Sequence, residues 1–365
     1  MSSLTEPIHE LQKHIRELKE RVASVCLPRT PNLYVLRMAY AVVIANIVLI
    51  VSGGVVRLTG SGLGCDTWPK CTSSGSWTTT PEMGIHGLVE FGNRMLTFVL
   101  IIVTGLTFLS ILRIAMPEAS SLSQWWKKLF TGLSHSRHQY SDLFNLSLLL
   151  LWGIPIQAVV GGLSVLLKLN PWMVTAHYML SAIMIALGAC YLNRVRRYFA
   201  SGVIESEGVL DSSLPQGAVF LKYLGWTSLV LVCFLIFMGT VTTGTGPHAG
   251  DPSAHRHAFN PWVVTRMHSF SVWAYLMVIL SSLYLARKYQ WSQALRRSWY
   301  WVLAVVVYQG VVGYIQFFNG LPVWLVEMHL LGSALFTWAA ITAAERQLVM
   351  ASQPSRRLAQ QRRIV

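Results

Sequence analysis

Four histidines occupy matching positions along the chain. His86, His177, His268 and His329 fall near one end of the second, fourth, sixth and eighth of eight long apolar stretches. A histidine inside a membrane span is costly unless it is used. Two imidazoles from facing helices at the same depth commonly hold a haem iron on both axial sides. The pattern therefore predicts one histidine pair in each half of the chain, with haem ligation as its chemistry.

A carboxylate accompanies the first pair. Glu90 follows His86 by one helical turn, so both side chains project from the same face of a helix. One interpretation is a hydrogen bond inside the bundle, with Arg94 as the natural partner. The other is a proton acceptor or charge stabiliser beside a bound substrate. Glu327, two residues before His329, points elsewhere on its helix and is expected to be structural.

Two loops carry further reactive side chains. Cys65 and Cys71 lie close together in a loop with Gly, Asp, Trp and Pro. On the oxidising side of a membrane they could form either a structural or a reversible disulfide. His248, His255 and His257 lie in the loop 244 to 261. They could meet a metal, but the Gly, Pro and Asp content of this loop favours a solvated segment.

The elements that carry these residues are predicted membrane spans. The 365-residue chain is 53% hydrophobic and only 12% charged, and stretches of about 20 apolar residues are long enough to cross a bilayer. We expect an all-α membrane protein with eight transmembrane helices. The predicted spans are 34 to 56, 86 to 112, 143 to 167, 172 to 193, 219 to 243, 262 to 286, 298 to 318 and 322 to 344.

The positive charges predict the orientation. Most of the 29 Lys and Arg residues lie in segment 1 to 32, in the tail 346 to 365, and in loops 113 to 141, 193 to 218 and 287 to 297. By the positive-inside rule both termini are cytoplasmic, and the histidine sites lie near the outer face. The net charge of +14 is thus a topology signal and not a nucleic-acid footprint. Segment 1 to 32 has no signal-peptide pattern and predicts an amphipathic helix.

The chain contains an internal repeat. Gln157 precedes His177 by 20 residues, and Gln309 precedes His329 by the same spacing. Gly54 to Gly60 also resembles Gly239 to Thr245. We therefore expect two tandem four-helix bundles in parallel orientation, residues 33 to 195 and 219 to 345, each with its own core site.

The motifs resemble those of a known family. The stretch VVRLTGSGLGC ending at Cys65, the WPKC that ends at Cys71, and IHGLVEFGNR from Ile85 to Arg94 are similar to the haem A synthase family, of the cytochrome oxidase assembly factor 15 type. The likeness extends over roughly residues 34 to 344. It implies an enzyme of the cytoplasmic membrane that oxidises the C8 methyl group of haem O to a formyl group by two hydroxylations, giving haem A for terminal oxidases.

The resemblance also implies roles for single residues. His268 and His329 would be the axial ligands of a haem b cofactor in the second half. The first half would receive haem O, with His177 on one side and Glu90 as the essential acid. It further implies a haem O synthase as a membrane partner and an electron donor, within the lipid bilayer; a homo-oligomer is also possible.

The sequence departs from the commonest family pattern in the first half. The family often has a histidine three residues after the helix-two glutamate, where this chain has Asn93. His86 could substitute as a substrate-haem ligand from a different height. Arg57 and Arg94 could pair with haem propionates; the alternatives are snorkelling toward the membrane surface or pairing with Glu90.

Two other classes of protein compete with the enzyme. A bis-histidine transmembrane cytochrome that only carries electrons would place its haems near opposite faces, whereas all four histidines here are predicted near one face. A transporter is suggested by the duplicated bundle, and it would need broken helices or charges near the midplane.

Overall fold

The computed structural model describes residues 10, 13–18, 27–115, 127, 130–131, 140–201 and 215–352. These residues form helices, turns and loops, and no strand occurs among them. The eight long helices are α2 (Leu33–Leu58), α3 (Gly84–Ala115), α5 (Ser141–Leu166), α6 (Pro171–Ser201), α7 (Ala218–Thr245), α8 (Pro261–Lys288), α9 (Gln293–Phe318) and α10 (Val323–Ser352). A short 3₁₀ helix, η1 (Pro81–Met83), leads into α3.

All eight helices are long and apolar enough to span a membrane, which confirms the predicted all-α membrane fold. Three of them extend at least five residues further than the apolar pattern predicted: α6 runs on to Ser201, α9 begins at Gln293, and α10 runs on to Ser352. The hydrophobic pattern stops where the hydrocarbon would stop, while the helix itself continues for one or two turns in a polar environment. Hydropathy therefore located the spans but not these helix ends.

Polar residues define where several helices start. The Asn32 side chain accepts a hydrogen bond from the Val35 amide at 3.2 Å and caps α2. Asn260 caps α8 in the same way, and the Pro261 that follows suits the first helical position because its missing N–H needs no partner.

The predicted amphipathic helix in segment 1 to 32 lies mostly outside the described residues; residues 13–18 of it are helical. The tail beyond Ser352 also lies outside them.

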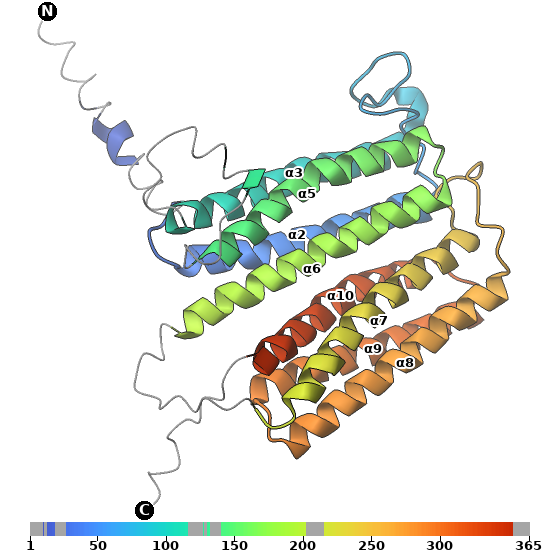
Figure 1. Cartoon of the computed structure of the whole chain (residues 1–365). Helices are drawn as coiled ribbons and strands as arrows, with labels where there is room; N and C mark the ends of the chain where they lie inside the picture. The colour runs from blue at the N-terminus through green and yellow to red at the C-terminus, as the bar shows by residue number, and fades with distance from the viewer. Residues whose placement is uncertain are drawn as a thin grey trace, which may run out of the picture.

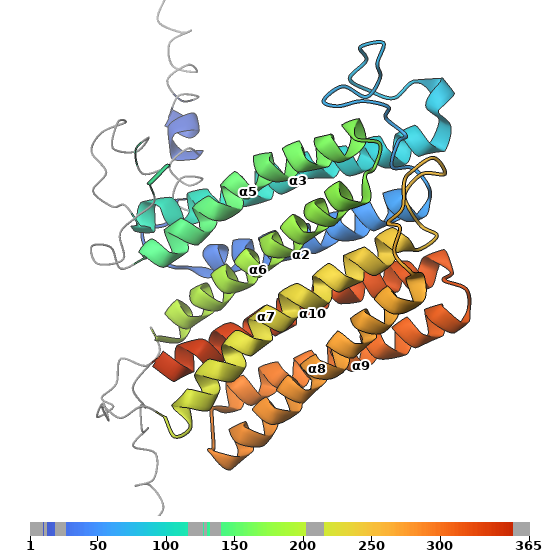
Figure 2. The ribbon, with the colours of Figure 1, turned by 45° about the vertical axis from the view of Figure 1, so that its right-hand side comes forward.

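The helices pack as two rings of four. α2, α3, α5 and α6 contact one another in that cyclic order, and α7, α8, α9 and α10 do the same. Figures 1 and 2 show the two groups one beside the other, with all helices running between the same two ends of the molecule. Each ring encloses a core that is reached by side chains from four helices.

The first and last helices of each ring make the interface between the rings. α2 packs on α10, α6 packs on both α7 and α10, and the relation between the rings is close to a twofold one. The Tyr178 side chain of α6 packs against the buried clusters of both rings. The interface is thus formed by equivalent helices, as expected for a duplicated bundle.

Charged residues join the rings at the end where α10 finishes. The Glu345 carboxylate of α10 accepts hydrogen bonds from Asn193 at 2.8 Å, Arg194 at 3.2 Å and Arg197 at 3.3 Å, all from α6. Arg194, Arg197 and Glu345 lie just beyond the predicted spans, and Asn193 is the last residue of its span. They pair charges from the two rings where apolar packing ends.

We predict that Glu345→Ala lowers the free energy of unfolding by about 1–2 kcal/mol, because Arg194 and Arg197 lose their shared partner while remaining partly exposed. The measurement is the thermal unfolding midpoint of the detergent-purified protein. Lys222→Ala, which removes an exposed charge on α7, is the control. Equal midpoints for both variants would contradict the prediction.

Candidate functional site

The candidate site residues lie at one end of the molecule, here called the disulfide end. It carries the loop 59–80 after α2, the loop 246–260 after α7, and the α5–α6 and α9–α10 turns (Figures 1 and 2). His177, His268 and His329 lie six or seven residues inside the first residues of α6, α8 and α10. Three histidines from three helices are therefore at nearly the same depth, about 9–11 Å along the helix axis.

The second ring brings two of these histidines face to face. The ring centroids of His268 and His329 are 6.4 Å apart and their planes are at 78°. A metal–nitrogen bond of about 2 Å on each side, plus roughly 1 Å from each nitrogen to its ring centre, requires roughly 6 Å between centroids. The Nδ1 atom of His329 is buried and has no hydrogen-bond partner in the described part of the chain. The pair therefore fits a single haem iron with two axial imidazoles.

The first ring holds one buried histidine at that depth. The His177 ring lies against Gly161 of α5, and its Nδ1 atom is buried without a partner among the described residues. His86 is only two residues inside α3, is exposed, and shares a 2.9 Å hydrogen bond with the Ser61 hydroxyl. Asn93 accepts a 2.6 Å hydrogen bond from Ser52 of α2. No hydrogen bond or ring contact in the described chain joins His177 to His86 or Asn93.

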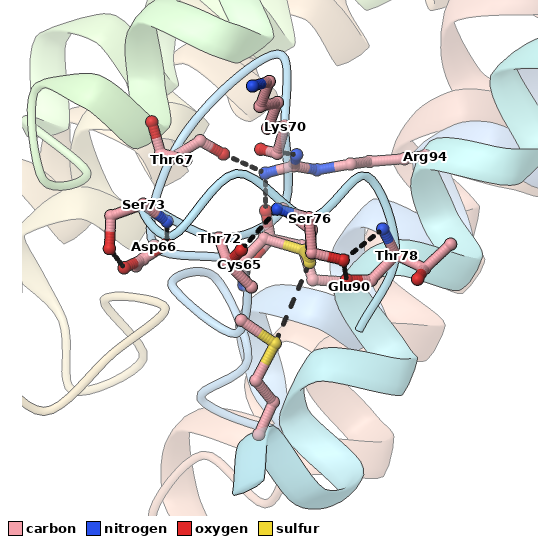
Figure 3. The surroundings of a disulfide bond; sticks show 12 residues. Cys65, Asp66, Thr67, Lys70, Thr72, Ser73, Ser76, Thr78, Glu90 and Arg94 are labelled. Carbon is pink, nitrogen blue, oxygen red and sulfur yellow. Dashed lines mark hydrogen bonds and ion pairs between the residues drawn. A yellow bond between two sulfur atoms is a disulfide. The ribbon is translucent and has the colours of Figure 1, made fainter. Parts of the chain in front are cut away.

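The Glu90 carboxylate is the centre of a hydrogen-bonded cluster at the disulfide end (Figure 3). It is only 5% exposed. One oxygen accepts from the Cys65 amide at 2.6 Å and the other from the Arg94 guanidinium at 2.6 Å. Arg94 also donates to the carbonyls of Thr67 and Lys70. The predicted Glu90–Arg94 pair is thus formed, and it fastens the loop to α3.

A disulfide closes this loop. Cys65 and Cys71 are bonded and both are buried, so the structure has the bridge that the sequence allowed. The loop also reaches α5, because Trp68 lies so close to Gly162 that a methyl group there would be 2.3 Å from the indole ring. Gly162 directly follows Gly161, which lies against the His177 ring. The loop therefore connects the Glu90 side of the first ring to the His177 side.

A second set of contacts joins the loops of the two rings. Arg57 of α2 donates to the carbonyls of His248 at 2.6 Å and Thr243 at 3.0 Å, and the Gly62 amide donates to the Gly250 carbonyl at 2.8 Å. Arg57 therefore does not pair with Glu90. Its guanidinium binds carbonyl oxygens of the other ring.

The loop 246–260 is less solvated than its composition suggested. His257 is 7% exposed and packs against Trp172 and Phe259, and His248 binds the Leu321 carbonyl. Burial, and then the positive charge of Arg57, lower the pKa of His257, so the ring is neutral at neutral pH. The prediction of a solvated loop was wrong for these two histidines, because Trp172 of α6 packs against the His257 ring and His248 hydrogen-bonds the α9–α10 turn.

Glu327 was expected to be an ordinary structural residue, and its surroundings are unusual. It faces Gly54 of α2 across the interface between the rings, and a methyl group on that glycine would be 2.6 Å from a carboxylate oxygen. Both of its oxygens are buried and lack a hydrogen-bond partner in the described chain. A carboxylate inside a predicted span is the sequence signal that would have marked it.

Comparison with known proteins fits this geometry. The sequence profile of the COX15-CtaA family, described as cytochrome oxidase assembly protein, matches residues 36–341. The chain belongs to this family. It is 23% identical over 322 residues to a protein named "Heme A synthase" from Lysinibacillus sphaericus (strain C3-41), covering 84% of this chain and 92% of the relative. It is 20% identical over 292 residues to a "Heme A synthase" from Bacillus pumilus (strain SAFR-032), covering 78% and 85%.

Membership of the COX15-CtaA family supports the haem A synthase function predicted from the sequence over the electron carrier. It makes the chain a multi-pass membrane oxidoreductase that is associated with haem. The matched range begins in α2 and ends in α10. Both rings are therefore covered by the family likeness.

We predict that Arg94→Met makes the Cys65–Cys71 disulfide about tenfold faster to reduce, because the loop loses charge-assisted hydrogen bonds to two carbonyls and Glu90 loses its partner. Timed treatment with a phosphine reductant, followed by alkylation of freed thiols with a mass tag, measures the rate. Arg266→Met is the control, since Arg266 stacks on Trp262 at the same end of the molecule. If the two variants are reduced at the same rate, Arg94 does not fasten the loop.

Proposed function

We propose that this chain oxidises the C8 methyl group of haem O to a formyl group, giving haem A. Two successive hydroxylations are required, and the second gives a hydrate that loses water. The observation that carries the proposal is the difference between the two rings. One has two facing histidines spaced for a resident haem iron, and the other combines a single buried histidine with a buried, fixed carboxylate.

In this proposal His268 and His329 hold haem b, which supplies electron transfer when bound. If both histidines bound the iron, the haem would supply electron transfer, and the oxidation itself would be left to the other ring. The first ring then receives haem O, with His177 as its axial residue. The two sites are at the same depth in adjacent rings, as a transfer of electrons between them requires.

Glu90 is the proposed catalytic residue. Its two oxygens already accept hydrogen bonds from the Cys65 amide and Arg94, so it is held as a carboxylate in a fixed position. A fixed negative charge stabilises positive charge that develops on a nearby substrate without any reorganisation cost during the reaction. The remaining lone pairs of the carboxylate can accept a proton. His86 and Asn93 are secondary candidates for contact with haem O.

The orientation and the partners are proposed from the sequence. The basic loops support an orientation with the disulfide end on the outer side of the cytoplasmic membrane, where a disulfide persists. Haem O would be delivered by a haem O synthase in the same membrane, and an electron donor would reduce haem b. Association of two or more copies of the chain is compatible with this scheme.

The function is tested in a host that makes haem O but no haem A. We expect haem A, or the hydroxylated intermediate, in extracted haems when the wild-type chain is expressed. Glu90→Gln should retain bound haem b and reduce haem A formation at least a hundredfold, the cost typical of a lost electrostatic stabiliser. Unchanged haem O, with the wild-type protein carrying haem b and a supplied reductant, would favour the electron carrier. Full haem A production by Glu90→Gln would leave Glu90 a structural residue.

We predict that His268→Ala and His329→Ala each abolish the low-spin haem b spectrum, because one imidazole cannot supply both axial ligands. The measurement is the reduced-minus-oxidised absorbance spectrum, with haem content per protein. His255→Ala, in the exposed part of loop 246–260, is the control and should retain the wild-type spectrum. An unchanged low-spin spectrum in both ligand variants would refute the assignment.

A further inference from the structure

The helix before each candidate ligand carries a glutamine and a glycine one turn apart. In the second ring, the Gln309 side-chain amide of α9 donates to the His329 carbonyl at 2.9 Å. Four residues later, Gly313 lies beside the His329 ring, and a methyl group there would be 3.4 Å from Cε1. α9 therefore holds both the backbone and the ring of His329.

The first ring repeats this arrangement. Gln157 of α5 donates to the His177 carbonyl at 3.4 Å. Gly161 lies beside the His177 ring, and a methyl group there would be only 2.8 Å from Cε1. A carbonyl has two lone pairs, so each histidine can accept this bond in addition to one within its helix. The same two side-chain types in both rings indicate a common task.

We propose that Gln157 with Gly161, and Gln309 with Gly313, are seats that position His177 and His329 toward haem, and that the glutamine bond is the firmer one in the second seat. The proposal rests on the proposed function, because it takes the second ring to hold a resident haem and the first to exchange substrate with product. The glutamines are positioning residues, since they act on the haem only through the histidine. Neither glutamine side chain contacts its histidine ring through a hydrogen bond.

The difference in firmness has a local cause in α10. Gln309 lies against Gly332, where a methyl group would be 2.7 Å from its Oε1 atom. The residue at the equivalent position of the first ring is Leu180. A glycine allows α9 to approach α10 closely enough for a direct 2.9 Å bond, whereas the contact of Gln157 with His177 is longer.

Two equivalent serines add to the difference. Ser181 and Ser333 each lie 24 residues after the glutamine of their ring. Gln157 donates one amide hydrogen to the Ser181 hydroxyl and the other to the His177 carbonyl, and Ser181 also donates to that carbonyl at 3.1 Å. Ser333 is instead hydrogen-bonded to Tyr178 of the first ring, which leaves the Gln309 amide to His329. Among the described residues, Gln309 is therefore the one side-chain donor to the His329 carbonyl, whereas the His177 carbonyl accepts from both Gln157 and Ser181.

The glutamines are tested with methionine, which keeps the volume and removes the donor. Proteins purified with haem b are mixed with excess apomyoglobin, and the rate of haem loss and the midpoint potential of haem b are measured. We expect Gln309→Met to lose haem b about 3- to 20-fold faster, the range that one interhelical hydrogen bond supplies in a membrane, and to shift the potential. Gln157→Met should lose haem b at the wild-type rate and keep its midpoint potential. Its affinity for haem O, measured by Soret titration, should fall less than threefold.

The glycines give the converse test. Gly161→Ala should reduce haem O binding at least tenfold while the haem b spectrum stays unchanged, because a methyl group 2.8 Å from Cε1 forces the His177 ring to move. Gly313→Ala, with 3.4 Å available, should have a smaller effect on haem b. Gly310→Ala on α9, where no atom lies within 4 Å, controls for the change of glycine to alanine, which itself favours the helix.

Haem b loss at the wild-type rate in Gln309→Met, or equal effects of the two glutamine variants on their own haems, would overturn the proposal. These readouts do not need turnover. If the wild-type chain made no haem A while Gln309→Met still released haem b faster, the reaction assignment would fail and the seats would stand. If haem A were made and Gln309→Met behaved as wild type, the seats would fail and the reaction assignment would stand.

Discussion

The hydrogen bond from the Cys65 amide to the Glu90 carboxylate holds the first ring's site together. Inside hydrocarbon, a carboxylate needs partners from the protein because water is scarce. Glu90 takes one from the loop and one from Arg94, and Arg94 in turn binds two loop carbonyls. The loop is thereby fixed against α3 at one side, and Trp68 reaches α5 at the other. Without the carboxylate, the loop would lose its hydrogen bond to α3, and Trp68 would no longer be held against α5 from that side.

The duplicated fold gives each ring the same frame and different contents. α2, α6, α7 and α10 form the interface in equivalent pairs, so two sites at equal depth follow from the duplication itself. In the second ring, a methyl group on Gly239 of α7 would lie 3.2 Å from Cε1 of His268. In the first ring, Asn93 accepts a hydrogen bond from Ser52, and no ring contact among the described residues pairs His177 with a second histidine. The helix packing is equivalent in the two rings, and the side chains inside them differ.

Much of the fold could be predicted from the sequence, because span length and hydropathy are local properties. The helix count and order needed only apolar stretches and loop charges. The polar ends of α6 and α10 could not be predicted in this way, since Glu345 and its partners are stabilised by contacts between rings. The burial of His257 was also beyond a local pattern, because Trp172 covers it from another part of the chain.

The site shows the same division between local and distant information. One-turn spacing was enough to predict the Glu90–Arg94 pair, and the 20-residue spacing was enough to find the repeated glutamines. Spacing could not show that Gln309 has a glycine opposite it while Gln157 has a leucine at the equivalent position. The glutamine bond to the histidine carbonyl is 2.9 Å in the second ring and 3.4 Å in the first. A ring that must release its haem after each reaction benefits from the looser of the two arrangements, and a ring that retains its haem benefits from the tighter one.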